Sequence, residues 1–438
     1  MNTEDPLAVT AAHVTVARLG AATVDTPLTE LLGSRRESLH YVIETDRVLL
    51  DDTVDTAVRR NVGAADLPAF EPGGPRAKLF FEPSATSVGI VTCGGLCPGL
   101  NNVIRGLVLE LTDHYGVNSI VGFRNGYQGL TDRSEPMVMT RAIVNDIHGR
   151  GGTILGTSRG SQNPGEMVDT LVDRGIDILF VIGGDGSLRG AQSISDEAQR
   201  RGLDIAVVGI PKTIDNDIPW IDHSFGFQTA FARAAESIRS AHTEASSTAG
   251  GLGLVKLMGR HSGFIACYAT LANPDVDFVL VPEVGFEIDA FLLCLRKRIE
   301  ARGHAVVVVA EGAGQELFEA GDSKDASGNK KLADIGALLK ERIAEHFVDA
   351  PLSIRYVDPG YAIRSVPANA YDAVYCVRLA QAAVHAAMAG FTSMVVGRWH
   401  GRFIHLPISM TTSGRNKVDP QGDLWMSVLE TTGQPLTF

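Results

Sequence analysis

Two aspartates follow an apolar run near the middle of the chain, where a core-forming segment gives way to charge. The stretch 209–220 reads GIPKTIDNDIPW, with Lys212 and Thr213 just before Asp215 and Asp217. A carboxylate at the end of a strand can take the proton of a hydroxyl group that attacks phosphorus. Asp and Asn are also favoured at the N-cap of a helix, so these residues alone leave catalyst and cap equally open.

A second cluster places Asp185 among glycines in the stretch 181–191, VIGGDGSLRGA. Glycine lets a ligand approach the backbone closely. A lone carboxylate would repel a phosphate, unless it holds Mg²⁺, a cation that prefers oxygen ligands and can bridge phosphates. The alternative is a turn that caps the helix after Ser187, with no ligand.

A third glycine-rich turn is the stretch 92–102, TCGGLCPGLNN, in which Gly94 and Gly95 follow an apolar run. Pro98 suits the first turn of a helix, where its missing N–H costs nothing. A strand, a glycine turn and a helix N-terminus together present backbone N–H groups to a phosphate. A tight strand-to-helix turn without a ligand remains open here.

Four arginines stand near glycines in an otherwise acidic chain: Arg159, Arg260, Arg355 and Arg364. The guanidinium fork matches the oxygens of a phosphate group. Any one of these arginines could instead form a surface salt bridge. The recurrence of the pattern favours a phosphate-binding pocket.

Short apolar runs rich in β-branched residues alternate with longer segments of helical spacing. Continuous apolar runs of five or six residues are typical of strands buried on both faces. The predicted strands cover 87–92, 119–123, 178–182, 205–210, 252–257, 278–281 and 305–310. The predicted helices cover 103–115, 190–201, 228–243 and 333–347.

This alternation predicts parallel α/β sheets with helices on both faces. Ligands of such sheets bind at the carboxyl ends of the strands. All three clusters described above follow predicted strands, so each is predicted at a strand end, where such sheets bind their ligands.

Composition limits the class of protein. The chain has 438 residues, 45% hydrophobic and 21% charged, which is enough for two or three domains. A formal net charge of −12 argues against nucleic-acid or anionic-membrane partners, although it permits a local basic pocket. Five scattered cysteines imply no disulfide framework and favour a reducing cytoplasm. Neither a signal peptide nor a membrane span is expected.

Two further segments differ from the α/β pattern. Alternation is weak in residues 1–85, which we interpret as an N-terminal extension, and 71–84 has the turn chemistry of a linker. The polar, glycine-containing stretch 319–331 is predicted to be a mobile surface loop.

Taken together, the segments resemble the 6-phosphofructokinase family, and the resemblance covers about residues 87–414. The motifs follow the order CGGLCPGLNNVIRG, GGTILGTSRG, GGDGS, PKTIDNDI, SFGFQTA, KLMGRHSGF, VPE, AEGAG and YVDPGYAIRS. The first and fourth motifs are similar to the branch that contains plant and trypanosomal ATP enzymes and their pyrophosphate-dependent relatives.

The resemblance implies two Rossmann-like three-layer α/β domains with parallel-rich sheets, an active site in the inter-domain cleft, and the N-terminal extension 1–85. The nucleotide-binding domain would comprise 86–227 with about 363–415. The sugar-phosphate-binding domain would comprise 228–362 with about 416–438. A homotetramer is implied by the resemblance alone.

The resemblance also implies transfer of the ATP γ-phosphoryl group to the C1 hydroxyl of fructose 6-phosphate. Asp215 would be the general base, with Lys212 and Arg260 assisting catalysis, and Asp185 would hold Mg²⁺. Residues implied for ATP are Gly94, Arg159, Gly160, Gly184, Asp185, Gly186 and Ser187. Residues implied for the sugar phosphate are Thr213, Ile214, Asp215, Met258, Gly259, Arg260, Glu311, Arg355, Tyr361 and Arg364, with Arg355 reaching the 6-phosphate across a subunit boundary.

The phosphoryl donor depends on Gly186, where pyrophosphate-dependent members of the family carry Asp. Glycine leaves space for a nucleotide α-phosphate and favours ATP. Lys212 occurs in pyrophosphate enzymes and in this branch of ATP enzymes, so it discriminates little. A pyrophosphate-dependent enzyme therefore stays open as an alternative, as do an NAD or lipid kinase, which shares GGDG, and a non-catalytic sugar-phosphate sensor.

Overall fold

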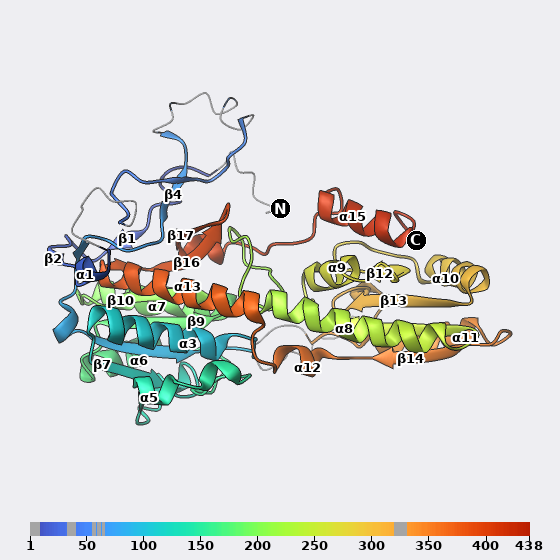
Figure 1. Cartoon of the computed structure of the whole chain (residues 1–438), viewed down its shortest axis with the longest axis horizontal. Coiled ribbons are helices and arrows are strands. Elements are labelled where there is room, and N and C mark those ends of the chain that lie inside the picture. The colour runs from blue at the N-terminus through green and yellow to red at the C-terminus, as the bar shows by residue number, and fades with distance from the viewer. Residues whose placement is uncertain (1–8, 33–40, 55–57, 59–62, 64–65, 319–330) are drawn as a thin grey trace.

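The computed structural model describes residues 9–32, 41–54, 58, 63, 66–318 and 331–438. The predicted surface loop at 319–331 lies outside the described residues except for Lys331. Two α/β halves lie along the long axis of the molecule, each built around its own sheet (Figure 1). The prediction of a two-domain α/β fold with parallel-rich sheets is confirmed.

The larger sheet has nine strands in the order β3-β4-β17-β16-β10-β9-β6-β7-β8. The five neighbours from β16 to β7 run parallel, whereas β17, β4, β3 and β8 pair antiparallel with their neighbours. The strands are β3 (Val48–Leu49), β4 (Ala69–Pro72), β6 (Ser87–Thr92), β7 (Ser119–Phe123), β8 (Met137–Val138), β9 (Ile178–Gly183), β10 (Ala206–Pro211), β16 (Met394–Trp399) and β17 (Arg402–Pro407).

Helices cover both faces of this sheet because successive side chains of a strand point to opposite sides. In β9, Phe180 and Ile182 belong to the core under α3 and α13, while Leu179 and Val181 belong to the core under α6 and α7. The covering helices are α3 (Leu100–Leu109), α13 (Ala370–Met388), α6 (Pro164–Asp173) and α7 (Asp185–Arg200).

The smaller sheet is fully parallel, in the order β12-β13-β11-β14. Val306 and Val308 of β13 share a core with α8 and α9, whereas Val307 and Val309 share one with α10 and α11. The strands are β11 (Gly251–Leu257), β12 (Phe278–Leu280), β13 (His304–Ala310) and β14 (Ser353–Val357). The helices are α8 (Phe227–Ser246), α9 (Phe264–Leu271), α10 (Ile288–Arg302) and α11 (Ile335–His346).

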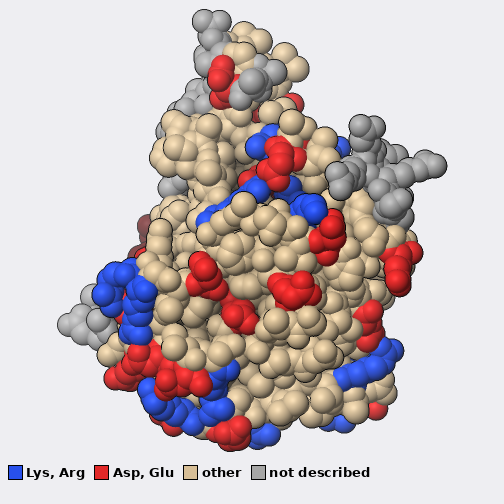
Figure 2. All heavy atoms as spheres, turned by 90° about the vertical axis from the view of Figure 1, so that its left-hand side faces the viewer, with Lys and Arg blue, Asp and Glu red and all other residues tan. Residues whose placement is uncertain are grey.

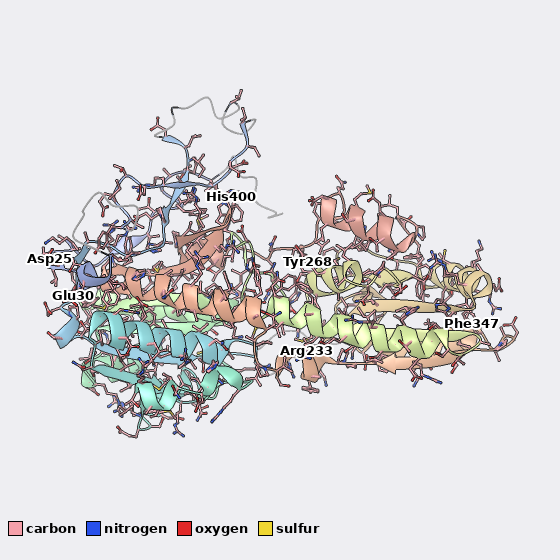
Figure 3. All side chains as sticks on the ribbon, viewed as in Figure 1. Asp25, Glu30, Arg233, Tyr268, Phe347 and His400 are labelled. Carbon is pink, nitrogen blue, oxygen red and sulfur yellow. The ribbon has the colours of Figure 1, made fainter. Side chains whose placement is uncertain are left out.

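One hydrophobic core continues from the larger sheet into the smaller one, through α13 and α8. Figure 1 shows these two helices end to end across the middle of the molecule. In Figure 3, Phe347 marks the end of the smaller half that lies farthest from the larger half, and His400 marks the β16–β17 hairpin. The other α-helices within the described residues are α1 (Thr29–Leu32), α4 (Gln128–Thr131), α5 (Arg141–Val144), α12 (Gly360–Arg364), α14 (Ile408–Thr411) and α15 (Asp423–Thr432).

The N-terminal segment is part of the larger half. β3 and β4 extend its sheet, β1 (Ala17–Arg18) pairs with β15 (Phe391–Thr392), and β2 (Val24–Asp25) pairs with β5 (Lys78–Leu79). The prediction of a linker at 71–84 is wrong, because Arg76, Leu79 and Phe81 are buried there. Apolar side chains in this stretch outweigh its turn-forming prolines and glycines.

The predicted helices are present with shifted ends. The predicted helix at 103–115 starts earlier, at Leu100, and its last six residues (Glu110–Tyr115) form a π-helical turn. The helix predicted at 190–201 begins at Asp185, directly after the glycines. None of the helices within the described residues is both long enough and apolar enough to span a membrane. Acidic and basic side chains intermingle on the face seen in Figure 2.

Candidate active site

A cleft of about 700 Å³ opens where strand ends of the two sheets face each other. Turns after β6, β9 and β10, three neighbouring parallel strands, line it from the larger half. The turn after β11 and helix α12, which follows β14, line it from the smaller half. The three clusters therefore lie at one edge of the larger sheet, because β10, β9 and β6 are neighbours.

The turn after β6 brings Gly94 against Lys212. Gly94 has φ +84°, a left-handed conformation that favours glycine, and a Cβ there would lie 3.7 Å from Lys212 Nζ. The Gly94 carbonyl accepts a hydrogen bond from Thr157 Oγ1 at 2.6 Å, which ties this turn to the loop that carries Arg159. The Lys212 backbone N–H donates to the Gly183 carbonyl at 3.0 Å, so the ends of β9 and β10 stay joined.

The N-terminus of α3 does not face the cleft. Its N-cap, Gly99, is buried, and a Cβ there would lie 2.7 Å from Cys376 Sγ. Pro98 precedes this cap and lies outside the first helical turn, which corrects the prediction. The glycine turn at Gly94 therefore lines the cleft, whereas the helix N-terminus that was expected to complete a phosphate site packs into the core.

Asp185 is the first residue of α7 and points into the cleft. Arg189, one turn along the same helix, pairs with its Oδ2. Burial raises the pKa of the Asp185 carboxyl, although Arg189 and Arg415 oppose the shift. Its Oδ1 is buried without a hydrogen-bond partner among the described residues. Gly186 is exposed, with nothing within 4 Å of where a Cβ would stand.

The loop after β10 holds the two aspartates apart. Asn216, between them, adopts the left-handed conformation (φ 57°), which Asn tolerates better than most residues. Its Oδ1 accepts a hydrogen bond from the Ser224 N–H at 2.8 Å, and this fixes the loop. Thr213 Oγ1 donates to Asp217 Oδ1 at 2.7 Å. Because Asp217 is engaged in this way, Asp215 is the carboxyl group left for a ligand.

Asp215 sits in an environment that disfavours its charge. Burial raises the pKa of this carboxyl to about 8, and the charges of Asp217 and Glu311 act in the same direction. Its Oδ1 is buried without a hydrogen-bond partner among the described residues. Burial likewise lowers the pKa of the nearby Lys212 ammonium. Buried, perturbed groups at a cleft are typical of catalytic sites.

The smaller half contributes Met258 and Arg260 to the cleft wall, directly after β11. Between them Gly259 has φ +132°, and a Cβ there would lie 2.6 Å from the Ser262 carbonyl oxygen, so glycine is required. Glu311 follows the neighbouring strand β13, and its N–H donates to the Leu257 carbonyl at 2.9 Å. Burial raises the pKa of Glu311, and Arg260 opposes this shift.

Among the other residues predicted for the sugar phosphate, Arg364 and Tyr361 lie together on α12, whereas Arg355 lies on β14. Arg364 lines the cleft from α12, with its guanidinium 4.5 Å from the centre of the Tyr361 ring. Tyr361 is 78% exposed. Arg355 lies outside the cleft lining, on the exposed edge strand β14, where it pairs with Glu244 at 3.4 Å.

Most predicted site residues therefore come together in one cleft. Those that line it are Gly94, Arg159, Gly160, Gly184, Asp185, Gly186, Ser187, Lys212, Thr213, Ile214, Asp215, Met258, Arg260 and Arg364. Arg189 and Arg415 also line it, although neither is among the residues predicted from the sequence. The spacing of four between Asp185 and Arg189 was a usable signal for the first. No local pattern marks Arg415.

The charges that line the cleft suit anionic ligands. Six basic side chains line it against three carboxylates, although the whole chain is acidic. Such a local excess of positive charge concentrates anionic ligands. The basic residues are Arg159, Arg189, Lys212, Arg260, Arg364 and Arg415, and the acidic ones are Asp185, Asp215 and Asp217.

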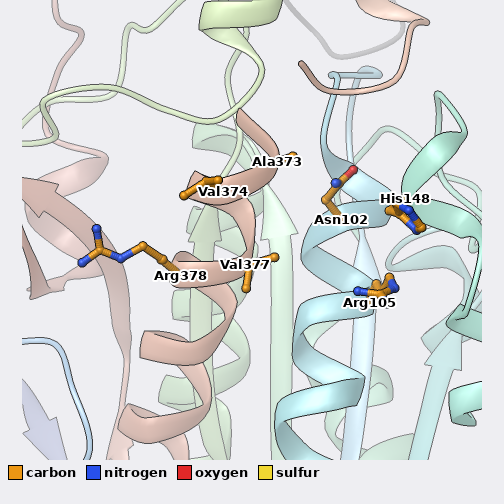
Figure 4. Close-up of a pocket in the computed structure, with 7 residues that line it drawn as sticks. All are labelled: Asn102, Arg105, His148, Ala373, Val374, Val377 and Arg378. Carbon is orange, nitrogen blue, oxygen red and sulfur yellow. The ribbon is translucent and has the colours of Figure 1, made fainter. Parts of the chain in front are cut away.

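A second cavity, of about 340 Å³, lies between α3 and α13 (Figure 4). Arg105, His148 and Arg378 border an otherwise mainly apolar lining. None of its lining residues is a carboxylate. It therefore offers no general base of the kind found in the larger cleft.

The fold and the cleft define a two-domain α/β protein with a basic cleft where parallel strands of both sheets end, beside a buried carboxyl group. Comparison with known proteins identifies the family within this class to which the chain belongs. The family described as Phosphofructokinase matches residues 87–387, and this chain belongs to it.

Two relatives and one solved structure illustrate the similarity. The chain is 56% identical to an ATP-dependent 6-phosphofructokinase of Amycolatopsis methanolica, over 97% of this chain and 95% of the relative. It is 48% identical to ATP-dependent 6-phosphofructokinase 1 of Arabidopsis thaliana, over 88% and 84%. A pyrophosphate-dependent phosphofructokinase structure from Marinobacter aquaeolei shares the fold, with a TM-score of 0.67 at 21% identity, covering 79% of this chain and 91% of that one.

Proposed function

We propose that this chain is an ATP-dependent 6-phosphofructokinase. It would transfer the γ-phosphoryl group of ATP to the C1 hydroxyl of fructose 6-phosphate, which gives fructose 1,6-bisphosphate and ADP in glycolysis. The observation that carries the proposal is the buried Asp215 carboxyl in an anion-binding cleft, in a chain similar over nearly its full length to enzymes of that name.

Asp215 acts as the general base in this proposal. It takes the proton of the C1 hydroxyl as that oxygen attacks the γ-phosphorus, and the bond to the ADP oxygen breaks on the opposite side. Lys212 and Arg260 balance the charge of the transferring group. Their location supports these roles, since both line the same cleft as Asp215.

The nucleotide lies along the larger half in this proposal. Backbone groups of the turn Gly184–Ser187 and of Gly94, with Arg159 and Gly160, hold its phosphates. Gly186 supports ATP over pyrophosphate as the donor, because its position is exposed and open. An aspartate there would bring a negative charge into this space.

The carboxylates of the cleft fit a magnesium ion. Asp185 keeps a buried oxygen without a partner, and Asp217 lies close enough to affect its pKa. No group of three or more His, Cys, Asp or Glu side chains among the described residues could form a complete protein cage. Mg²⁺ suits such a sparse site, because it keeps waters and takes its other ligands from phosphates. When bound, it would neutralise charge on the phosphoryl oxygens.

Fructose 6-phosphate lies along the smaller half in this proposal. Arg260 and Arg364 supply positive charge for its phosphate, and Glu311 accepts hydrogen bonds from its hydroxyl groups. Thr213, Ile214 and Met258, which line the cleft, complete the pocket. Gly259, next to Met258, and Tyr361, whose ring contacts Arg364, support them from outside the lining.

Arg355 has a different proposed role, because it is exposed outside the cleft lining. We assign it to the 6-phosphate site of a neighbouring subunit in a homo-oligomer that works in the cytoplasm. Arg355→Ala should raise the KM for fructose 6-phosphate about tenfold, with little change in kcat or Tm. An unchanged KM would remove this assignment.

Paired assays with ATP and with pyrophosphate test the function directly. With fructose 6-phosphate and Mg²⁺ present, we expect ADP to form from ATP and no turnover with pyrophosphate. Asp215→Ser should lower kcat by about 10²–10⁴-fold while the protein still melts cooperatively. Turnover with pyrophosphate alone would reverse the donor assignment. Full activity of the folded variant would remove Asp215 as the base.

A further inference from the structure

Arg415 lies between two carboxylates of the cleft. Its Nη1 pairs with Asp217 Oδ2, and its Nη2 lies 3.6 Å from Asp185 Oδ2. The Asp217 and Asp185 side chains are 6% and 16% exposed, whereas the Arg415 side chain is 32% exposed. One partly exposed guanidinium therefore pairs with two largely buried carboxylates.

The pairing leaves the carboxylates only partly satisfied. Asp185 also pairs with Arg189, yet its Oδ1 has no hydrogen-bond partner among the described residues. Arg189 is itself shared, because it donates to the Thr412 carbonyl at 3.3 Å. Two carboxylates that share one guanidinium, with an Asp185 oxygen still free, form half of an oxygen site that a small divalent cation can complete.

Backbone contacts hold the segment of Arg415 independently of its side chain. The Asn416 N–H donates to the Asp217 carbonyl at 2.8 Å. The Val418 N–H donates to Glu283 Oε1 at 2.8 Å, and this carboxylate also accepts from the Gly263 N–H at 3.0 Å. The guanidinium can consequently leave Asp217 without detaching the backbone that carries it.

We propose that Arg415 is a built-in counter-ion, which holds the cation position between Asp185 and Asp217 in the ligand-free protein and exchanges with the divalent cation. The proposal rests on the proposed Mg²⁺-dependent function. The guanidinium and a metal ion compete for the same oxygen atoms and repel each other. Arg415 is a positioning residue in this scheme, because its pairing holds the two carboxylates in place until the cation arrives.

Binding of Mn²⁺ to the full-length protein, followed by electron paramagnetic resonance without nucleotide or sugar, tests the exchange. Arg415→Met should bind Mn²⁺ about tenfold more tightly than the unchanged protein, the size of effect that removal of one nearby like charge has on a pKa. Arg415→Gln should show the same tightening, because it keeps a polar group but lacks the charge. Arg415→Lys should restore the weaker binding.

Arg342→Met is the matched control, since it removes an exposed arginine of α11 that pairs only locally with Glu345. Its Mn²⁺ affinity should not change. A thermal melt gives a second reading: without metal Arg415→Met should melt below the unchanged protein, and Mn²⁺ should raise its Tm by the larger amount.

Two results would overturn the inference. Equal or weaker Mn²⁺ binding by both neutral variants would show that Arg415 does not compete with the cation. If neither Arg415→Met nor Arg415→Gln folds, Arg415 is a fixed structural counter-ion and does not exchange with the cation. The proposed function fails separately: if neither the unchanged protein nor Arg415→Met binds Mn²⁺, or if the control Asp185→Asn binds it as well as the unchanged protein does, the metal assignment itself is wrong.

Discussion

Thr213 Oγ1 donates a hydrogen bond of 2.7 Å to Asp217 Oδ1 and also accepts one of 3.2 Å from the Asp215 N–H. A single hydroxyl group thus joins the backbone of one aspartate to the side chain of the other. The two carboxyl groups, although only two residues apart, are held in different surroundings. Asp217 is paired and hydrogen-bonded, whereas burial raises the pKa of Asp215.

Thr213→Val tests this hydroxyl. The substitution keeps the shape of the side chain but leaves the Asp217 carboxylate short of a donor in a buried place, so the free energy of unfolding should fall by about 1–3 kcal/mol. We expect kcat to fall as well, because the loop no longer fixes Asp215. Denaturant melts and steady-state kinetics measure both. Thr213→Ser should restore them, and an inactive Thr213→Ser variant would contradict the role of the hydroxyl.

Asp215 predicts the pH dependence of activity. A base must be deprotonated, and its pKa in the free protein is raised to about 8, so kcat/KM should rise with pH through about 8. Cations of the bound complex favour the carboxylate, so kcat should rise at lower pH than kcat/KM. Rates measured from pH 6 to 9 decide this. A kcat/KM that is level across the whole range would contradict the assignment.

The same pKa predicts a gain in stability for Asp215→Asn. The folded-state pKa of Asp215 lies above the unfolded value of about 4, so folding loses stability as pH rises from that value through about 8. Asparagine has a similar shape and no charge, and it avoids this loss. The variant should match the unchanged protein near pH 4 and exceed it in Tm above pH 8. Equal Tm values at high pH would show that Asp215 ionises freely in the fold.

Gly186→Asp separates ligand binding from stability. The position is exposed and open, and an acidic side chain in the first turn of α7 suits the helix dipole, so Tm should not fall. The new carboxylate should raise the KM for ATP at least tenfold, which equals about 1.4 kcal/mol.

Gly190→Ala, one turn along α7, is the contrasting variant. Its Cβ would lie 2.5 Å from the Tyr127 ring, so it should destabilise the protein by about 1–3 kcal/mol. An unchanged KM for ATP in Gly186→Asp would mean that the nucleotide does not pass this position.

Much of the parallel core could be predicted from the sequence. Strands β6, β9 and β13 are continuous apolar runs because both of their faces are covered, and the turns after such strands carry Gly94, Asp185 and Glu311. The position of the site then follows from the parallel arrangement, since polar residues at the carboxyl ends of neighbouring strands meet at one edge.

Other features depend on contacts that no local pattern records. Arg415 meets Asp217 from 198 positions away in the chain, after a hairpin and a short helix. The pairing of β4 with β17 joins residues 72 and 404 through strands too short for a recognisable period. Arg355 directly precedes the motif YVDPGYAIRS, which predicted a place in the site. Its edge strand β14 nevertheless lies outside the cleft lining of a single chain.

The pairing of β4 with β17 has a consequence for solubility. Glu71 and Pro72 pair with the outer side of β17, opposite His405 and Ile404, and the Gly73 N–H donates to the Phe403 carbonyl at 2.7 Å. All three belong to the segment before the first α/β motif. Deletion of that segment would expose a row of unpaired N–H and C=O groups beside buried apolar side chains. Such an open strand edge is a template for the strand of another chain. By pairing with β17, the N-terminal segment removes this template from the edge of the strand.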